Sequence, residues 1–514
     1  MTSTAELNIL TEPLIRVRAG SRLSLMTLSE VLDALGRAEA LEFPALQPHQ
    51  AHAWHAFLVQ LAASALHAAG TTSIESAPWS ELLLSLVQGD ADAWALVRED
   101  LEKPAFMQPP AEKASLTGYK TTVETPDALD VLLTAKNFDV KGTRATKATP
   151  EHWLLALVSK QTTEGFSGRD NYGIARMNGG FSSRPCVTLA PDLSWGKRFV
   201  RDTQIWLERR AKLIEDFGYE CEVGPLLWLH PWEGTEQLYL QQLDPFFIEV
   251  CRRIRLVRDG DRLVARTAGS KKSRIDVSEH KGATGDIWTP VDKDRGASLT
   301  LSSRGFHYKD LCRIVFSETW SWGAALEANA EDGDSPVLIA RALVRGQGKT
   351  EGFHERVVPL PGKKSRQLFT RPTEASKFAK RSQDQVEAAG AAAKKVLKPA
   401  LLCMIQGGPA RDQIKYSDTR ASPWLDRFDQ RVDDIFFSEL FDTIEEGLAD
   451  IPALQRWKAR LAELVTEVFT QAKREIPVPE ARRPRTIALA ELLFFGARKR
   501  ELPSTTSKPS TTAA

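Results

Sequence analysis

Alternating apolar and polar positions predict β-hairpins in the first two-thirds of the chain. One hairpin joins residues 14–18 to residues 23–26 across a turn that contains Gly20. Another joins residues 254–258 to residues 262–266 across an Asp-Gly pair, which is the strongest short hairpin signal between alternating apolar residues. The chain is therefore expected to contain antiparallel sheet.

A further predicted hairpin has a long, glycine-rich tip. The apolar runs 337–344 and 353–360 flank residues 345–352, which include three glycines and two basic residues. Strand-like runs on both sides predict a tip that is held stiffly. The residues at this tip that are candidates for contact with a ligand are Gln347, Gly348, Lys349 and Thr350.

Apolar residues spaced three and four apart predict helices in other segments. Residues 49–69 are apolar and rich in alanine throughout, which is typical of a buried helix. Residues 195–217 have the pattern of a long amphipathic helix. Shorter helices are predicted over residues 79–88, 91–100 and 127–134, and from residue 244 onward.

From Thr373 onward the strand patterns disappear, and four amphipathic helices are predicted. The first ends at Pro399, and the second has Ser422 as its cap and Pro423 at its first position. The four helices cover residues 374–398, residues 422–446, a segment opened by Pro452, and about residues 485–500. Four such helices in succession indicate a bundle.

These patterns predict an α+β protein with a large mixed α/β domain followed by a C-terminal four-helix bundle. A chain of 514 residues usually forms two or three domains. The expected ranges are 1–370 for the mixed domain, 371–502 for the bundle and 503–514 for a disordered tail rich in Ser, Thr and Pro.

Composition narrows the class of protein. Hydrophobic residues make up 42% of the chain, and no run of about 18 apolar residues occurs, so we expect a globular protein without a membrane span. The first residues lack the pattern of a secretory signal. Five scattered cysteines without a Cys-x-x-Cys pair favour a reducing cytoplasmic location over disulfides or a zinc ribbon.

The charges are almost balanced, with 68 basic and 67 acidic residues and a net charge of +1. A protein that binds nucleic acid by itself usually has a large basic excess. The balance is compatible with a subunit that touches nucleic acid over small patches inside a larger complex.

Signatures of an enzyme are weak. The Gly-Lys-Thr tripeptide at 348–350 suggests a phosphate-binding loop, but that motif requires glycine where Leu343 stands, and a helix where a strand-like run follows. The acidic segments 292–294 and 331–334 look like solvated turns rather than the metal site of a nuclease. We therefore expect a non-catalytic protein without cofactor or metal.

Three histidines, at positions 49, 52 and 55, fall on the predicted buried helix. Residues three apart share a helical face, so a zinc site is one interpretation. Zinc sites usually take another ligand from elsewhere in the chain, and no carboxylate partner is placed here. Histidines in the core or on the helix surface are the favoured interpretation.

Residues 164–185 form the most informative stretch, with five glycines among aromatic and arginine residues. Glycine lets the backbone approach a ligand, and arginine and exposed amides offer donors to phosphates or base edges. An ordinary surface loop fits the composition equally well. The candidate contacts with phosphates or base edges are Gly165, Phe166, Ser167 and Gly168, and DNA is the ligand that the family resemblance given below implies.

Two other segments combine basic residues in ways that suit nucleic acid. Residues 136–147 contain four basic residues and one aromatic, which can hold phosphates and stack a base, or form a solvated loop. Its candidate contacts are Lys136, Asn137, Phe138, Lys141 and Arg144. The first bundle helix presents either DNA-backbone contacts or a solvated face, formed by Lys377, Lys380, Arg381, Lys394, Lys395 and Lys398.

The glycine-rich stretch also resembles a known family. Residues 165–168 and 178–185 resemble the glycine loop of CasA, the large subunit of the type I-E CRISPR Cascade complex. Four further segments resemble CasA in the same order along the chain: 7–13, 136–141, 285–290 and 345–352. The resemblance spans nearly the whole chain and implies a non-catalytic subunit of an antiviral defence complex.

The resemblance implies a function and a set of partners. The subunit would recognise the protospacer-adjacent motif (PAM) in duplex DNA, start strand separation towards an R-loop, and recruit the helicase-nuclease. Its partners would be the crRNA, the target duplex and the other Cascade subunits, namely the crRNA-end-capping subunit, the backbone subunit and the small-subunit dimer.

The resemblance also implies roles for particular residues. Lys281 matches a lysine that contacts the PAM, and residues 136–147 match a loop that reaches the guide-RNA end of the complex. The hairpin tip matches a wedge that displaces the first target base pair. Aligned on the following His-Glu-Arg, the wedge glutamine falls at Thr350, whereas the nearest glutamine is Gln347.

Two alternatives remain open at the level of the sequence. A structural or interaction protein would use the helix bundle without touching DNA. A nucleotide-dependent enzyme of the helicase type would hydrolyse ATP.

Overall fold

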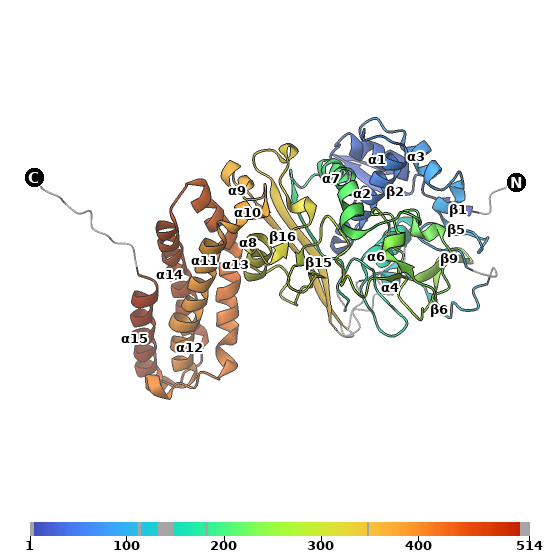
Figure 1. The fold of residues 1–514 in the computed structure, drawn as a ribbon. Coiled ribbons are helices and arrows are strands. Elements are labelled where there is room, and N and C mark those ends of the chain that lie inside the picture. The colour runs from blue at the N-terminus through green and yellow to red at the C-terminus, as the bar shows by residue number, and fades with distance from the viewer. Residues whose placement is uncertain (1–4, 112–114, 132–147, 180–182, 347–348, 504–514) are drawn as a thin grey trace, which may run out of the picture. The chain divides into compact units, whose positions relative to one another are not determined.

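The computed structural model describes residues 5–111, 115–131, 148–179, 183–346 and 349–503 (Figure 1). The chain forms two compact units. The first consists of Met1–Phe306 and Thr319–Val357, and the second of His307–Glu318 and Val358–Ala514. The second unit therefore contains residues 307–318 and 358–370 in addition to the range expected for the bundle.

The first unit begins with short antiparallel strands. Strand β1 (Ala5–Asn8) pairs with β5 (Ala95–Arg98), and the hairpin of β2 (Ile15–Ala19) and β3 (Arg22–Met26) is extended by β4 (Leu41–Glu42). The predicted N-terminal hairpin is confirmed. Strand β5 lies where a helix over 91–100 was predicted, and only a 3-10 turn precedes it, because pairing with β1 overrides the local preference.

Helix α1 (Leu28–Gly36) starts at a reciprocal cap. The Thr27 hydroxyl accepts a hydrogen bond from the Glu30 N–H, and the Glu30 carboxylate accepts one from the Thr27 N–H. Helices that contribute to the core follow: α2 (Ala51–Ala68), α3 (Trp79–Leu86), α6 (Pro150–Thr163) and α7 (Trp195–Phe217).

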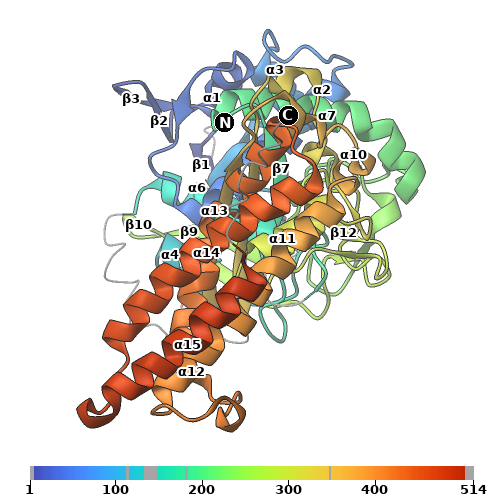
Figure 2. The ribbon, with the colours of Figure 1, turned by 90° about the vertical axis from the view of Figure 1, so that its left-hand side faces the viewer.

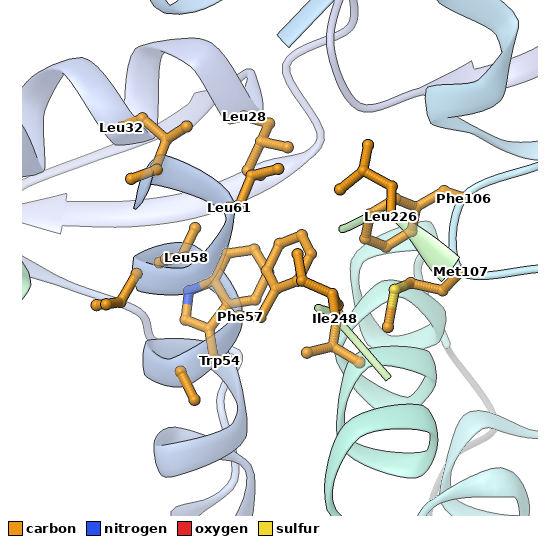
Figure 3. Packing of buried hydrophobic residues seen from close by; sticks show 14 of the residues in the cluster. Leu28, Leu32, Trp54, Phe57, Leu58, Leu61, Phe106, Met107, Leu226 and Ile248 are labelled. Carbon is orange, nitrogen blue, oxygen red and sulfur yellow. The ribbon is translucent and has the colours of Figure 1, made fainter. Parts of the chain in front are cut away.

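Helix α2 is the centre of the first unit. It contacts α3, α6 and α7, and its side chains are buried on nearly every face, as the uniform apolar pattern predicted. Figure 3 shows Trp54, Phe57 and Leu61 of this helix packed near Phe106 and Ile248 from distant parts of the chain. Each fully buried side chain of this size contributes about 1.5–3 kcal/mol to stability.

The second predicted hairpin forms with a different turn. Strands β9 (Arg253–Asp259) and β10 (Arg262–Ala268) pair so that Asp259 faces Arg262. The two-residue loop is therefore Gly260-Asp261 and not Asp259-Gly260. Only Gly260 has a positive φ, +61°, as a type II′ turn requires at its first central position. Strand β6 (Thr121–Val123) completes this sheet.

A three-stranded sheet supports the glycine-rich hairpin, in the order β16, β15, β7. Strand β15 (Val337–Gly346) lies in the centre, between β7 (Cys186–Ala190) and β16 (Lys349–Pro359). The strands continue into the segment expected to be a long loop, which corrects the predicted loop of 345–352. The sheet lengthens the strands because each added residue gains backbone pairing.

Several elements of the first unit are short. Helix α4 (Pro126–Leu129) ends before Asp130, so the helix predicted over 127–134 does not extend through the described residues 130 and 131. The helix predicted from Asp244 onward is also wrong, because no regular helix forms among the described residues between Asp244 and β9. The remaining short strands are β8 (Leu238–Tyr239), β11 (Ile275–Asp276), β12 (Val291–Asp292), β13 (Ala297–Ser298) and β14 (Trp320–Ser321).

The second unit is largely helical, and long helices run side by side in it (Figure 2). Its long helices are α11 (Ala379–Ala391), α13 (Ser422–Glu445), α14 (Asp450–Glu475) and α15 (Arg483–Glu501). Three short helices precede them: α8 (Tyr308–Phe316), α9 (Lys363–Gln367) and α10 (Pro372–Ser376). Together with the mixed first unit, this confirms the expected α+β fold class.

Within the described ranges, no helix combines the length and the apolar character that a membrane span requires.

Pro399 does not end the first bundle helix, contrary to the prediction. Helix α11 continues through a π-helical segment, η8 (Ala392–Leu397), into α12 (Lys398–Ile405). The Lys398 N–H donates to the carbonyl of Ala393, five residues earlier. A wider turn relieves the clash between a proline ring and the preceding turn, so the helix passes through Pro399. Ser422 is likewise the first residue of α13 and not its cap.

Candidate nucleic-acid interface

The glycine loop, residues 164–173, leaves α6 through a tight turn. The Ser167 N–H donates to the Asn171 carbonyl at 2.9 Å, and the Asn171 N–H donates to the Gly168 carbonyl at 3.0 Å. Gly168 has a φ of +116°, and a Cβ built on it would meet nothing within 4 Å. The turn therefore presents bare backbone to its surroundings at Gly168.

Gly173 closes the glycine loop by a close backbone approach. A Cβ at Gly173 would lie 2.5 Å from the carbonyl carbon of Gly165. Any side chain would push the two ends of the loop apart, so glycine is required at this position.

A buried carboxylate anchors the base of the glycine loop. Glu164 binds three cations: Lys160 at 3.0 Å, Arg252 at 2.9 Å and Arg345 at 2.7 Å. Burial alone would raise the pKa of Glu164, but these three charges outweigh it and lower the pKa to about 2. Arg252 also donates to the Gly165 carbonyl at 3.0 Å. The loop is therefore fixed by charge-assisted contacts with helix α6, with the residue before β9 and with strand β15.

The glycine loop and the loop that contains Lys281 line one cavity of about 400 Å³. The glycine loop contributes Phe166 and Tyr172, whose ring centroids are 6.0 Å apart. The later segment contributes Ser273, residues 275–278 and Lys281. The structure thus brings together two predicted site segments that are far apart in the sequence.

Lys281 stands on a strained turn at the edge of this cavity. Its φ is +46°, and the φ of Gly282 is +82°. A Cβ at Gly282 would lie 2.4 Å from the carbonyl carbon of Met177, so this turn packs directly on the segment after the glycine loop. The Lys281 side chain is exposed, and its ammonium donates to the Arg295 carbonyl at 3.2 Å. The backbone is fixed while the charge stays accessible.

Two buried ion pairs lie among or beside the segments that resemble CasA. Arg184 binds Asp286 with its Nη2 atom 2.8 Å from Oδ1, and Arg176 approaches Glu249 at 3.6 Å. Burial alone would raise the pKa of Asp286, but the charge and hydrogen bond of Arg184 hold it below its usual value. The first pair joins the segment before β7 to the loop after Lys281, which explains why arginine and aspartate occur in those two motifs.

No local pattern in the sequence signals the partners of these buried charges. The contacts of Glu164 with Arg252 and Arg345 were not predicted, because they join residues 88 and 181 positions apart in the sequence. Asp332, interpreted as part of a solvated turn, is buried and binds Arg201. That interpretation is therefore wrong for Asp332.

Several predicted contacts lie outside the described residues, and no side chain is described at Lys349 and Thr350. The residues of the basic loop, Lys136, Asn137, Phe138, Lys141 and Arg144, lie outside them, as do Gln347 and Gly348. Strand β16 begins at Lys349, so a strand and not a helix follows the Gly-Lys-Thr tripeptide.

The basic residues of the first bundle helix have different environments. Lys377 binds Glu374 at 2.7 Å, and Lys395 binds Glu501 at 3.2 Å. Lys394 is exposed, and Lys398 is partly exposed. Arg381 is buried and binds Asp450 at 2.8 Å, so it belongs to the packing of the bundle and not to a surface that faces DNA.

The three clustered histidines belong to the core, as favoured. His49 and His55 contact Asp130 and Asp202, each at 2.8 Å. The ring of His52 stacks on Phe353, and burial lowers the pKa of His52 to about 3. Among the described residues, no group of three potential ligands could hold a metal ion.

Solved structures share the fold of this chain. The Thermus thermophilus CasA (Cse1) structure has a TM-score of 0.65 at 17% sequence identity, covering 96% of this chain and 100% of that one. Cse1 structures from Acidimicrobium ferrooxidans and Thermobifida fusca have TM-scores of 0.64 and 0.63, both at 15% identity, and each covers 98% of its own chain and 96% or 97% of this one. No family model and no curated protein sequence matches the chain. The fold is that of CasA over nearly the full length.

Proposed function

We propose that this chain is the large, non-catalytic subunit of a type I-E CRISPR Cascade complex and recognises the PAM in duplex DNA. The shared CasA fold supports the proposal. The observation that supports it best is the single cavity lined by the glycine loop and by Lys281, since the resemblance assigns PAM contact to both segments. In this role the protein acts in the cytoplasm, where guide and target meet.

The geometry suits a minor-groove approach. Gly168 presents backbone without a side chain, and such a slim turn enters a groove about 6 Å wide. Lys281 supplies an accessible charge at the edge of the cavity for a phosphate or a base edge. Because guide pairing reads the target sequence, the protein needs to read only a short motif. The degenerate code of the minor groove predicts tolerant motif choice.

Strand separation falls to the hairpin of β15 and β16 in this proposal. Strand β15 lies between β16 and β7, so its pairing with β7 holds one strand of the hairpin in place. Its tip, with Gln347, Lys349 and Thr350, would displace the first target base pair. The loop 136–147 would contact the crRNA end of the complex, and the finished R-loop would recruit the helicase-nuclease.

One observation favours an interaction protein without DNA contact as the second candidate. The net charge is +1, and Lys377 and Lys395 are paired within the chain. A subunit that only connects others needs no basic surface.

The test compares crRNA complexes assembled with this chain, without it, and with Gly168→Asp. We expect the complete complex to prefer a duplex with the motif over one without it, and the complex lacking the chain to lose that preference. Gly168→Asp should weaken motif-dependent binding by about tenfold or more, because it adds bulk and negative charge beside phosphates. Assembly should remain normal.

Gly89→Asp is the matched control, since Gly89 also has a positive φ, +85°, and nothing within 4 Å of a built Cβ. It should bind like the wild type. Equal motif preference without the chain would favour the interaction protein, and failure of Gly168→Asp to assemble would make the glycine loop structural. ATP hydrolysis by the purified chain would support the enzyme alternative.

A further inference from the structure

Arg345 joins the glycine loop to the strand that forms the hairpin. It lies in β15, one residue before the strand ends at Gly346. One guanidinium nitrogen, Nη1, donates to Glu164 Oε1 at 2.7 Å, and the other, Nη2, donates to the Ser167 hydroxyl at 3.3 Å. A single side chain therefore contacts both the buried base of the loop and a residue within its turn.

We propose that Glu164 and Arg345 form a clamp that fixes the glycine loop against β15, so that motif reading and strand opening occur in one fixed geometry. The contact itself is independent of the proposed function, and its consequence for DNA rests on that function. Arg345 is a positioning residue in this proposal, since it acts through Ser167 and Glu164.

The clamp is stiff because its charges have little access to water. The Glu164 side chain is fully buried, and that of Arg345 is only 11% exposed. Separating a buried pair leaves uncompensated charge, so each alternative arrangement is costly. The planar guanidinium fixes two acceptors in a set geometry, which a lysine ammonium does not reproduce. Small motions of the loop are therefore transmitted to β15.

The surrounding charges make Arg345 the suitable residue to change. Arg345→Ala leaves Glu164 bound to Lys160 and Arg252, so the carboxylate stays compensated. Replacing Glu164 would leave three cations without their shared anion and endanger folding. Arg341→Ala is the matched control, because Arg341 lies on the same strand and binds Glu355 of β16 without contacting the glycine loop.

The first test measures amide hydrogen exchange of the purified chain and needs no DNA. In Arg345→Ala, exchange at the amides of Ser167 and Asn171 should rise about tenfold, as local opening becomes easier. Arg341→Ala should leave the exchange rates of these amides unchanged. Arg345→Lys should give exchange rates between those of the wild type and Arg345→Ala. Unchanged exchange in Arg345→Ala would overturn the clamp, whatever the function of the protein.

The second test measures R-loop formation by the assembled complex on a paired target and on one pre-opened beside the motif. Arg345→Ala should slow R-loop formation about tenfold on the paired target, within the usual range of coupling between sites, and much less on the pre-opened target. Arg345→Lys should restore part of the rate. Equal slowing on both targets, or none on either, would overturn the coupling.

The wild-type complex separates this inference from the proposed function. If R-loop formation by the wild-type complex does not depend on the motif, the proposed function is wrong. The hydrogen-exchange experiment still tests the clamp in that case, because it uses no DNA. If R-loop formation by the wild-type complex depends on the motif, and Arg345→Ala forms R-loops at the wild-type rate, only the proposed coupling is wrong.

Discussion

Buried ionised side chains fix the positions of the loops in the first unit. Arg184 with Asp286 and Arg201 with Asp332 each join segments more than 100 residues apart. Removing one partner of such a pair typically costs about 3–5 kcal/mol, because the other charge stays buried without compensation. These pairs hold the segments that they join in place from within the protein.

The buried His52 makes stability depend on pH. Its pKa is lowered from 6.5 to about 3 by burial and by the charges of Arg341, His49 and Arg184. The unfolded chain therefore binds a proton between these pH values that the folded chain does not. The contribution of neutral His52 to the free energy of unfolding is fully present above pH 6.5. This contribution falls by about 1.4 kcal/mol per pH unit as the pH decreases towards 3.

Denaturant unfolding from about pH 7 to about pH 4 checks this prediction. His52→Leu should reduce the pH dependence of the unfolding free energy by about 1.4 kcal/mol per pH unit below about pH 6. His280→Leu, at a partly exposed position, serves as the control and should keep the wild-type slope. Parallel slopes for the wild type and His52→Leu would contradict the prediction.

Neighbouring segments decide the shape of the elements themselves. Helix α11 passes through Pro399 because the π-helical segment η8 widens the turn before it, and Val396 and Leu397 of that segment are fully buried. Strands β15 and β16 continue into a glycine-rich segment because a sheet pairs their backbone. Packing on a neighbour outweighs the local tendency to break in both cases.

The hairpin tip carries a prediction about strand opening. Alanine at Gln347, Lys349 and Thr350 should slow R-loop formation on a paired target and have much less effect on one already mismatched beside the motif. Opening one base-pair step costs about 1.4 kcal/mol in stacking, so initial motif binding should persist. Kinetics on the two targets provide the measurement. Equal slowing on both would mean that the tip only adds charge.

The charge of the whole molecule limits how it can bind nucleic acid. With 68 basic and 67 acidic residues, the chain lacks the general attraction for DNA of a strongly basic protein. Any contact with phosphates must come from local groups. The free chain is therefore expected to bind DNA weakly, and the complex to supply most of the affinity.

Charge reversal at Lys394 and Lys398 tests for such a local group. If they contact the DNA backbone, Lys394→Glu with Lys398→Glu should weaken binding for all DNA sequences alike. It should also flatten the logarithmic salt dependence by about 0.9 for each phosphate that the protein no longer neutralises. Lys377→Glu is the control, since Lys377 is already paired with Glu374. Salt titrations of the assembled complex give the slopes, and an unchanged slope would place both lysines on a merely solvated face.

The sequence by itself determined the elements whose signals are local. The uniformly apolar α2 and the amphipathic bundle helices depend on residues within a few positions of one another, so the sequence predicted them directly. Five motifs in the same order as in CasA also predicted the CasA fold. Each motif is a short run of the sequence, so it could be recognised without knowing the structure. The glycine loop and Lys281 were identified in the same way.

Only the tertiary structure decided which of these segments meet. It placed Phe166 and Lys281 on one cavity, joined Glu164 to Arg345, buried Arg381 and Asp332, and made a strand of residues 95–98. Such partners lie tens to hundreds of residues apart, so no local pattern specifies them. The physical reason is that a buried charge or an unpaired strand is stable only beside its partner, and the path of the whole chain sets where that partner lies.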